Sequence, residues 1–176
     1  MPSSSKEGKE VIRKWISEIN APKKIVLDLG VGKGTYYNFF KKKSDILRQA
    51  KWIGIEVWKP YIEKYRLNDL YDNLYQEDIR NFNYSKLGKI DIVFAGDVLE
   101  HLTKEESISL IDQLIKLSKF IFISIPIVYY PQEEVEDNPF ERHIKDDWSH
   151  QEVLASFPNI KKSWEGKVIG VYLIET

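Results

Sequence analysis

Residues Ile25–Gly34 read IVLDLGVGKG and join an apolar run to a series of glycines. The first three residues are β-formers, as in a strand that is buried on both faces. After Asp28, glycine occupies alternate positions, at Gly30, Gly32 and Gly34. Glycine lets backbone N–H groups come close to a ligand, because it has no side chain and tolerates a positive φ. The stretch therefore predicts a strand and a loop that binds a nucleotide-type ligand.

The glycine spacing separates this loop from two other nucleotide-binding loops. A dinucleotide fingerprint has its third glycine three positions after the second, where the helix packs under a pyrophosphate. Here Thr35 occupies that position. A P-loop ends in Gly-Lys-Ser/Thr, whereas this loop ends in Gly32-Lys33-Gly34. The spacing departs from both patterns and disfavours a nicotinamide-dependent oxidoreductase.

The composition is that of an ordinary globular protein and predicts one domain over residues 1–176. Hydrophobic residues make up 43% and charged residues 30%, and the net charge of -1 gives no basic field for nucleic acid or membrane. The absence of cysteine excludes disulfides, thiolate metal sites and a cysteine nucleophile. The three histidines are far apart in sequence, so we expect no histidine metal site.

The first ten residues, MPSSSKEGKE, contain no apolar segment. No run elsewhere approaches the ~18 apolar residues of a membrane span. We therefore expect a cytoplasmic protein without a membrane partner. The sequence leaves open whether the protein forms a homodimer.

Strand and helix patterns alternate along most of the chain. Segment 1–22 contains an amphipathic helix over Lys6–Asn20, with an apolar stripe opposite its charges, and Pro22 ends it. The predicted strands are Ile25–Leu29, Trp52–Val57, a short one at Asn73–Gln76, Ile90–Ala95 and Phe120–Ile125. The predicted helices run from the glycine loop to about Lys43, over Lys59–Leu67, from a capping box at Thr103, and from Ser149 to about Phe157.

The end of the chain differs from this alternation. Ile160–Trp164 and Val168–Ile174 read as two strands around a turn at Glu165-Gly166. Strands joined by helices form right-handed crossovers and a parallel sheet. The predicted fold class is therefore α/β, a doubly wound, mostly parallel sheet of seven strands with a C-terminal antiparallel hairpin.

The pattern acid-x-Gly-x-Gly-x-Gly over Asp28–Gly34 resembles the cofactor loop of class I S-adenosylmethionine-dependent methyltransferases, in particular the small-molecule, type 11-like domains. The resemblance extends from about Lys24 to the C-terminus. It implies a Rossmann-like fold, binding of S-adenosyl-L-methionine and formation of S-adenosyl-L-homocysteine.

The resemblance also assigns cofactor contacts. The glycine loop would approach the methionine part of the cofactor and Asp28 its amino group, often through water. Glu56 would hold both ribose hydroxyls, because a carboxylate accepts two O–H donors. Asp78 and Ile79 would lie against the adenine. The predicted cofactor-binding set is Asp28, Gly30, Gly32, Gly34, Glu56, Val57, Asp78, Ile79 and Asp97.

Catalytic candidates follow the later strands. The segment Asp97–Leu102 resembles the one after the fourth strand in many of these methyltransferases. The methyl donor is already activated, so the protein chiefly aligns the acceptor and excludes water. A base is needed only if the acceptor must lose a proton. We predict Asp97, His143 and His101 as catalytic, with His101 structural as the alternative, and loop 126–147 on the substrate side.

The substrate-side loop is acidic, with seven carboxylates against one arginine and one lysine, and it would repel a phosphate backbone. The residues after the fourth strand, Gly96–Leu99, lack the Asn/Asp-Pro-Pro-aromatic sequence of amino-group nucleic-acid methyltransferases. We therefore favour an O or N acceptor on a small molecule or protein side chain. An RNA/DNA methyltransferase and a non-catalytic S-adenosylmethionine-binding accessory protein are the alternatives.

Overall fold

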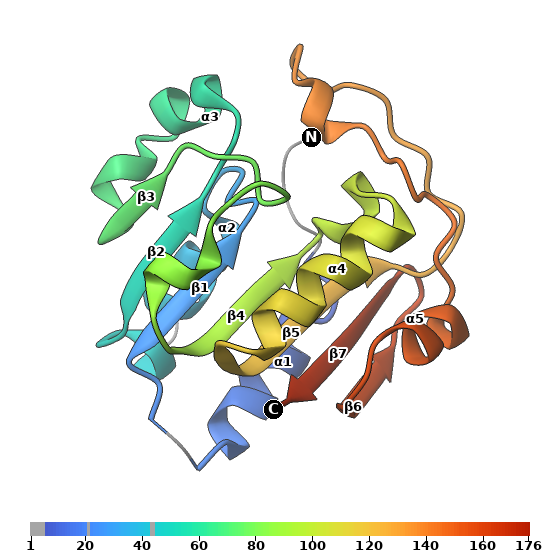
Figure 1. Cartoon of the computed structure of the whole chain (residues 1–176), viewed down its shortest axis with the longest axis horizontal. Helices are drawn as coiled ribbons and strands as arrows, with labels where there is room; N and C mark the ends of the chain where they lie inside the picture. Colours follow the sequence, from blue (N-terminus) through green and yellow to red (C-terminus); the bar gives the residue numbers. More distant parts are fainter. Residues whose placement is uncertain (1–5, 21, 43–44) are drawn as a thin grey trace.

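One seven-stranded sheet runs through the protein in the order β3-β2-β1-β4-β5-β7-β6 (Figure 1). The computed structural model describes residues 6–20, 22–42 and 45–176. The first five residues of the predicted N-terminal segment and the predicted helix end at Lys43 lie outside these ranges.

Five strands are parallel and two are antiparallel, as predicted. The parallel strands are β1 (Ile25–Leu29), β2 (Lys51–Ile55), β3 (Asn73–Tyr75), β4 (Ile90–Gly96) and β5 (Ser118–Pro126). The C-terminal hairpin consists of β6 (Ile160–Glu165) and β7 (Ile169–Glu175), and β7 inserts beside β5 with antiparallel pairing. The predicted fold class is therefore confirmed.

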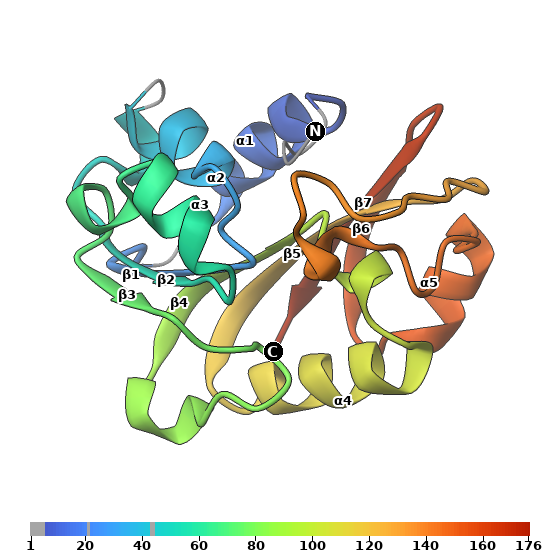
Figure 2. The same cartoon turned by 90° about the horizontal axis from the view of Figure 1, so that it is seen from above.

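Helices cover both faces of the sheet (Figure 2). The α-helices are α1 (Lys9–Glu18), α2 (Thr35–Tyr37), α3 (Lys59–Lys64), α4 (Lys104–Ile115) and α5 (His150–Ser156). Short 3₁₀ turns include η5 (Leu99–His101) and η6 (Pro139–Glu141). In the part of the chain that the structure describes, no helix is long and apolar enough to cross a membrane.

Two separate cores lie against the two faces, because successive residues of a strand point to opposite sides. Val26 packs with α1, α2 and α3, whereas Leu27 packs with α4 and α5. The strands in the middle of the sheet are buried on both faces, which explains why they read as continuous apolar runs. Helices on both faces of a mostly parallel sheet make the doubly wound arrangement.

The helix after the glycine loop differs from the prediction. After α2 the chain widens into a π-helical turn at Asn38–Lys42 instead of continuing as a regular α-helix. The aromatic side chains of this segment are nonetheless buried against the sheet, with Tyr36, Tyr37 and Phe40 all less than a tenth exposed. The packing of these rings, rather than helix regularity, fixes this segment.

The N-terminal segment is tied to the C-terminal hairpin. The Glu7 carboxylate accepts hydrogen bonds from the backbone N–H groups of Lys167, Val168 and Ile169, at 2.7, 3.2 and 3.2 Å. The helix α1 begins at Gly8, whose φ of 81° is left-handed. A Cβ atom there would lie 2.3 Å from Val171 Cγ2, so only glycine fits this approach to β7. These contacts hold α1 next to the site described below.

Candidate functional site

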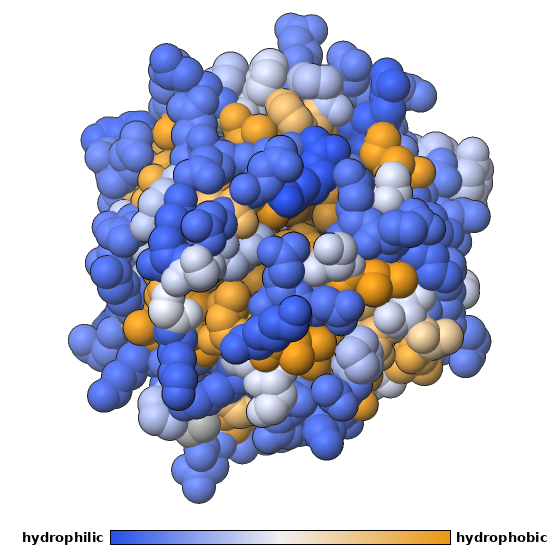
Figure 3. All heavy atoms as spheres, in the orientation of Figure 1, coloured by the Kyte–Doolittle hydropathy of each residue, from blue (hydrophilic) through white to orange (hydrophobic). Residues whose placement is uncertain are grey.

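A cavity of about 820 Å³ lies at the carboxyl ends of the parallel strands, where ligands bind in open α/β sheets. The glycine loop and the residues after β2 and β3 line one side, and segments 96–102 and 130–144 line the other. In the orientation of Figure 1, hydrophobic residues show in hollows between hydrophilic ones (Figure 3). The segment between β5 and α5, which contains the predicted substrate-side loop 126–147, crosses the carboxyl end of the sheet and lines the cavity.

The glycine loop has the conformation that its sequence predicts. All three glycines have positive φ, at 55° for Gly30, 55° for Gly32 and 73° for Gly34. A Cβ atom on Gly30 would lie 2.6 Å from Val98 Cγ2, so the loop depends on glycine for close packing as well as for conformation. Gly30 and Gly32 line the cavity, whereas Gly34 is the N-cap of α2 and lies behind the lining.

Glu56 links the end of β2 to the glycine loop. Its Oε2 accepts a hydrogen bond from the Gly32 N–H and its Oε1 accepts one from the Trp58 N–H, both at 2.8 Å. The residue is 5% exposed and lines the cavity. Burial raises the pKa of Glu56 to about 7, although the two N–H groups oppose this effect. Val57 follows it on the same wall.

Asp28 lies beneath the loop, behind the cavity lining, and is 2% exposed. Its Oδ2 accepts a 2.6 Å hydrogen bond from the Tyr71 hydroxyl. Burial raises the pKa of Asp28 to about 7, and Tyr71 and Lys9 oppose the rise. Lys9 is itself buried, at 1% exposed, which lowers its pKa, while Asp97 and Asp28 favour its charged form. The prediction that α1 keeps its charges opposite the apolar stripe is therefore wrong at Lys9, because this lysine offsets buried carboxylates.

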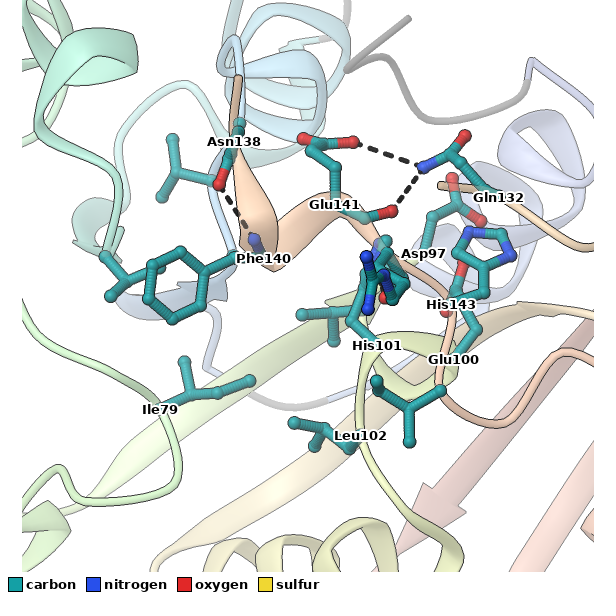
Figure 4. A pocket seen from close by; sticks show the side chains of 18 of the residues that line it. Ile79, Asp97, Glu100, His101, Leu102, Gln132, Asn138, Phe140, Glu141 and His143 are labelled. Atoms are coloured by element: carbon teal, nitrogen blue, oxygen red, sulfur yellow. Dashed lines mark hydrogen bonds between the residues drawn. The ribbon is translucent and has the colours of Figure 1, made fainter. Parts of the chain in front are cut away.

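Asp78 and Ile79 lie on the cavity wall after β3, together with Arg80. The Arg80 guanidinium donates to both carboxylate oxygens of Asp78. Burial favours the neutral form of Asp78, but Arg80 more than offsets it, so its pKa lies below the usual value. Ile79 is buried and offers an apolar surface (Figure 4).

Asp97 follows β4 in a left-handed conformation, with φ of 53°, which is uncommon for a residue other than glycine. Its N–H donates to the Ser124 carbonyl at 2.7 Å, and the Ser124 hydroxyl donates to its Oδ1 at 3.2 Å. Three residues later, Glu100 is 2% exposed. Burial, and then the charge of Asp97, raise the pKa of Glu100 well above its usual range.

The two candidate histidines meet although they are far apart in sequence. The ring centroids of His101 and His143 are 4.8 Å apart (Figure 4). His101 Nδ1 lies 3.1 Å from the Arg142 carbonyl, and His143 Nδ1 lies 2.5 Å from the Tyr130 carbonyl. Burial lowers the pKa of His101 to about 4 and also lowers the pKa of His143. Both rings line the cavity on the side formed by segments 96–102 and 130–144.

The structure thus brings most predicted site residues to one cavity, with Asp28 and Gly34 supporting it from behind. Sequence reasoning missed Glu7, Lys9 and Glu100. Glu100 stands beside His101 in a segment that the sequence analysis had already selected, and a carboxylate next to a histidine was the available signal. The sequence contains no such signal for Glu7 and Lys9, because charged residues at the start of a helix normally face solvent.

Comparison with known proteins supports the assignment of the fold. Residues 27–122, more than half of the chain, match a family model described as a methyltransferase domain. Comparison with curated proteins finds no match. Among solved structures, the N-terminal domain of EvdMO1 with SAH bound has a TM-score of 0.70 and 13% identity, over 98% of this chain and 82% of that one.

Two other solved structures have the same fold. An S-adenosylmethionine-dependent methyltransferase from Clostridium acetobutylicum has a TM-score of 0.70 and 15% identity, over 94% of this chain and 89% of that one. The small RNA methyltransferase HEN1 has a TM-score of 0.65 and 16% identity, over 99% of this chain and 26% of that one. The matched domain and this shared architecture show that the chain belongs to the methyltransferase-domain family and has the fold of class I methyltransferases.

Proposed function

We propose that this protein is an S-adenosylmethionine-dependent methyltransferase that moves a methyl group to oxygen or nitrogen on a small molecule or protein side chain. The observation that carries the proposal is one cavity wall on which a glycine loop and a buried carboxylate, Glu56, meet at the carboxyl ends of β1 and β2. Membership of the methyltransferase-domain family supports it.

The residues of this wall fit the cofactor. Gly30 and Gly32 line the cavity without a side chain, so that a ligand can approach the backbone of the loop closely. Each Glu56 oxygen accepts one backbone N–H and retains a further lone pair for a ribose hydroxyl. Ile79 would pack against the adenine ring and Asp78 lies beside it in sequence. When bound, S-adenosylmethionine supplies a methyl group that is already activated on its sulfonium.

The charge of the cavity suits a cationic cofactor. Seven acidic and three basic residues line it, namely Glu7, Glu56, Glu77, Asp78, Asp97, Glu100 and Glu141 against Lys33, Arg80 and Arg142. Burial raises the pKa of Glu56 and Glu100, but the other five acidic residues still outnumber the basic ones. Arg80 is paired with Asp78, and Arg142 is paired with Glu133 and Glu134. The same acidity opposes a phosphate backbone, so we favour a neutral or cationic acceptor over RNA or DNA.

The acceptor side of the cavity combines polar and apolar groups. Asp97, His101 and His143 lie on it, and we propose that they orient the acceptor and promote the loss of its proton. Tyr130, Phe140 and Ile144 also line the cavity and are 48%, 38% and 54% exposed. Exposed apolar side chains at the edge of a cavity favour an acceptor with apolar or aromatic surface.

Calorimetry with S-adenosylmethionine and S-adenosylhomocysteine tests the cofactor. We expect both to bind; failure of both would refute the proposal. Incubation of a cell extract with methyl-labelled S-adenosylmethionine then tests the acceptor, with the label measured separately in small-molecule, protein and RNA fractions. Label in RNA would overturn our preference for the acceptor. Binding without transfer to any fraction would identify a non-catalytic accessory protein.

A further inference from the structure

Three side chains of metal-ligating type meet at the acceptor side of the cavity. Glu100, His101 and His143 each offer one ligand atom, and these atoms all lie within 4.8 Å of one another. The first two come from η5, after β4, and the third comes from the loop after β5 (Figure 4). Two imidazoles and one carboxylate form a donor set typical of divalent zinc and other first-row transition metals.

The carboxylate of Glu100 is buried and incompletely satisfied. The residue is 2% exposed, and its Oε2 has no hydrogen-bond partner among the described residues. A buried carboxylate oxygen without a partner costs free energy that a cation would recover. Asp97 and Glu141 add further negative charge around Glu100. A buried, incompletely satisfied carboxylate that offers an oxygen within 4.8 Å of ligand atoms of both histidines distinguishes the cluster from an ordinary group of acidic side chains.

Both histidines have a backbone partner of the kind that supports a metal-bound imidazole. In each ring Nδ1 lies at hydrogen-bond distance from a backbone carbonyl, that of Arg142 for His101 and that of Tyr130 for His143. A carbonyl oxygen only accepts hydrogen bonds, so Nδ1 carries the proton and the neutral ring has its lone pair on Nε2. A backbone carbonyl on the second nitrogen is the usual support of a metal-bound histidine.

Backbone contacts hold the loop ligand next to the other two. The Glu100 carbonyl accepts hydrogen bonds from the N–H groups of Ile144 and Lys145, at 2.8 and 3.0 Å. The His143 N–H donates to the Gln132 carbonyl at 2.9 Å. The residue after His143 is thus bonded directly to Glu100, so the three ligands are brought together by the fold itself.

We propose that Glu100, His101 and His143 bind a divalent first-row transition-metal ion. Three protein ligands leave coordination positions open, and because all three residues line the cavity, these positions face the acceptor. A hydroxyl coordinated there loses its proton more easily. The acceptor hydroxyl releases its proton to water, its oxygen gains the methyl group, and the carbon–sulfur bond breaks with its electron pair left on sulfur. This role rests on the proposed function and narrows the acceptor to oxygen.

Metal titration of the whole chain tests the site. The protein is stripped with a chelator and titrated with Co²⁺, followed by visible absorption, and with Zn²⁺, followed by calorimetry. We expect one ion per chain. The variants Glu100→Gln and His143→Gln should bind the ion with an affinity at least about a hundredfold lower. Loss of an outer-shell partner alone lowers metal affinity by about 10- to 100-fold, and these variants lose a ligand.

His150→Gln is the matched control. This third histidine lies on α5, outside the cavity lining, with its Nδ1 2.8 Å from the Tyr172 hydroxyl. The control should bind Co²⁺ as the wild type does. Failure of the wild type to bind either ion, or unchanged binding by Glu100→Gln and His143→Gln, would overturn the inference. His143 is only partly buried and lies in a loop, so its variant keeps the test valid if Glu100→Gln does not fold.

S-adenosylhomocysteine calorimetry on the same samples separates the two proposals. Metal binding without S-adenosylhomocysteine binding would leave the metal site standing and refute the proposed function. S-adenosylhomocysteine binding without metal binding would leave the proposed function standing and refute the metal site. A metal-independent transfer to an oxygen acceptor would refute the catalytic role assigned to the ion, even if the ion binds.

Discussion

Replacing Glu56 by glutamine should weaken cofactor binding without weakening the fold. The pKa of Glu56 is about 7 in the folded protein, compared with the usual 4.5. This difference means that folding destabilises the ionised form of its carboxyl group by roughly 3 kcal/mol. Because the folded pKa is raised, wild-type stability should fall as pH rises from 4.5 to about 7 and then stay level. The amide does not titrate, so this contribution is absent from the variant.

The same substitution removes part of the proposed ribose contact. An amide offers one acceptor oxygen, and its NH₂ group would face a hydroxyl or backbone donor. A hydrogen bond to a charged group contributes about 1.5–3 kcal/mol. Losing one of the two ribose bonds and weakening the other should therefore cost about 3 kcal/mol of binding free energy. At about 1.4 kcal/mol per factor of ten, affinity for S-adenosylhomocysteine should fall roughly a hundredfold at pH 8.

Urea unfolding at several pH values and calorimetry at pH 8 measure the two effects. As pH rises from 4.5 to 8, the free energy of unfolding of the variant should increase relative to that of the wild type by up to roughly 3 kcal/mol. The hydrogen bond from a backbone N–H that the variant loses should offset about 1.5 kcal/mol of this difference. Glu63→Gln is the control, because it removes the same charge from an exposed position on α3. Parallel pH profiles for wild type and Glu56→Gln, together with unchanged affinity, would refute the reasoning.

Three further substitutions test the packing around the site. Tyr71→Phe removes the 2.6 Å hydrogen bond to the buried Asp28 and should lower the free energy of unfolding in urea at pH 8 by about 1.5–3 kcal/mol. Gly96→Ala places a Cβ 2.1 Å from the Tyr36 ring and should lower thermal stability by about 1–3 kcal/mol or more, as overpacked cores do. Thr103→Ala removes the α4 capping box and should cost about 1 kcal/mol in urea, with unchanged affinity for S-adenosylhomocysteine. A loss below 0.5 kcal/mol, on the order of ordinary surface substitutions, would contradict each stability prediction.

The strands and their parallel or antiparallel direction could be predicted from the sequence because both follow from local patterns. Apolar runs gave the buried strands, and the hairpin followed from two runs around Glu165-Gly166. Element ends were less certain, and the π-helical turn at Asn38–Lys42 was not foreseen. It interrupts a continuous helical pattern, and only the packing of Tyr36, Tyr37 and Phe40 against the sheet reveals it.

The positions of the candidate cofactor residues could be predicted from the sequence because these residues follow directly on the ends of strands. Glu56 and Asp78 follow β2 and β3, so strand assignment alone locates them. The buried pairing of Lys9 with carboxylates joins the first helix to the ends of β1 and β4. No pattern within α1 marks Lys9, because its partners are distant in sequence. Contacts between distant segments are the information that local patterns lack.

The acceptor side depends on such contacts almost entirely. His143 reaches His101 only because the loop after β5 folds back and bonds to the Glu100 carbonyl. Those bonds use backbone groups, so the loop could change its side chains at Tyr130, Phe140 or Ile144 and still return to the same place. In the proposed function, the opposite wall binds the cofactor. The fold would then separate the part of the site that holds the methyl donor from the part that selects the acceptor. Changes in the loop should alter acceptor choice while leaving the affinity for S-adenosylhomocysteine intact.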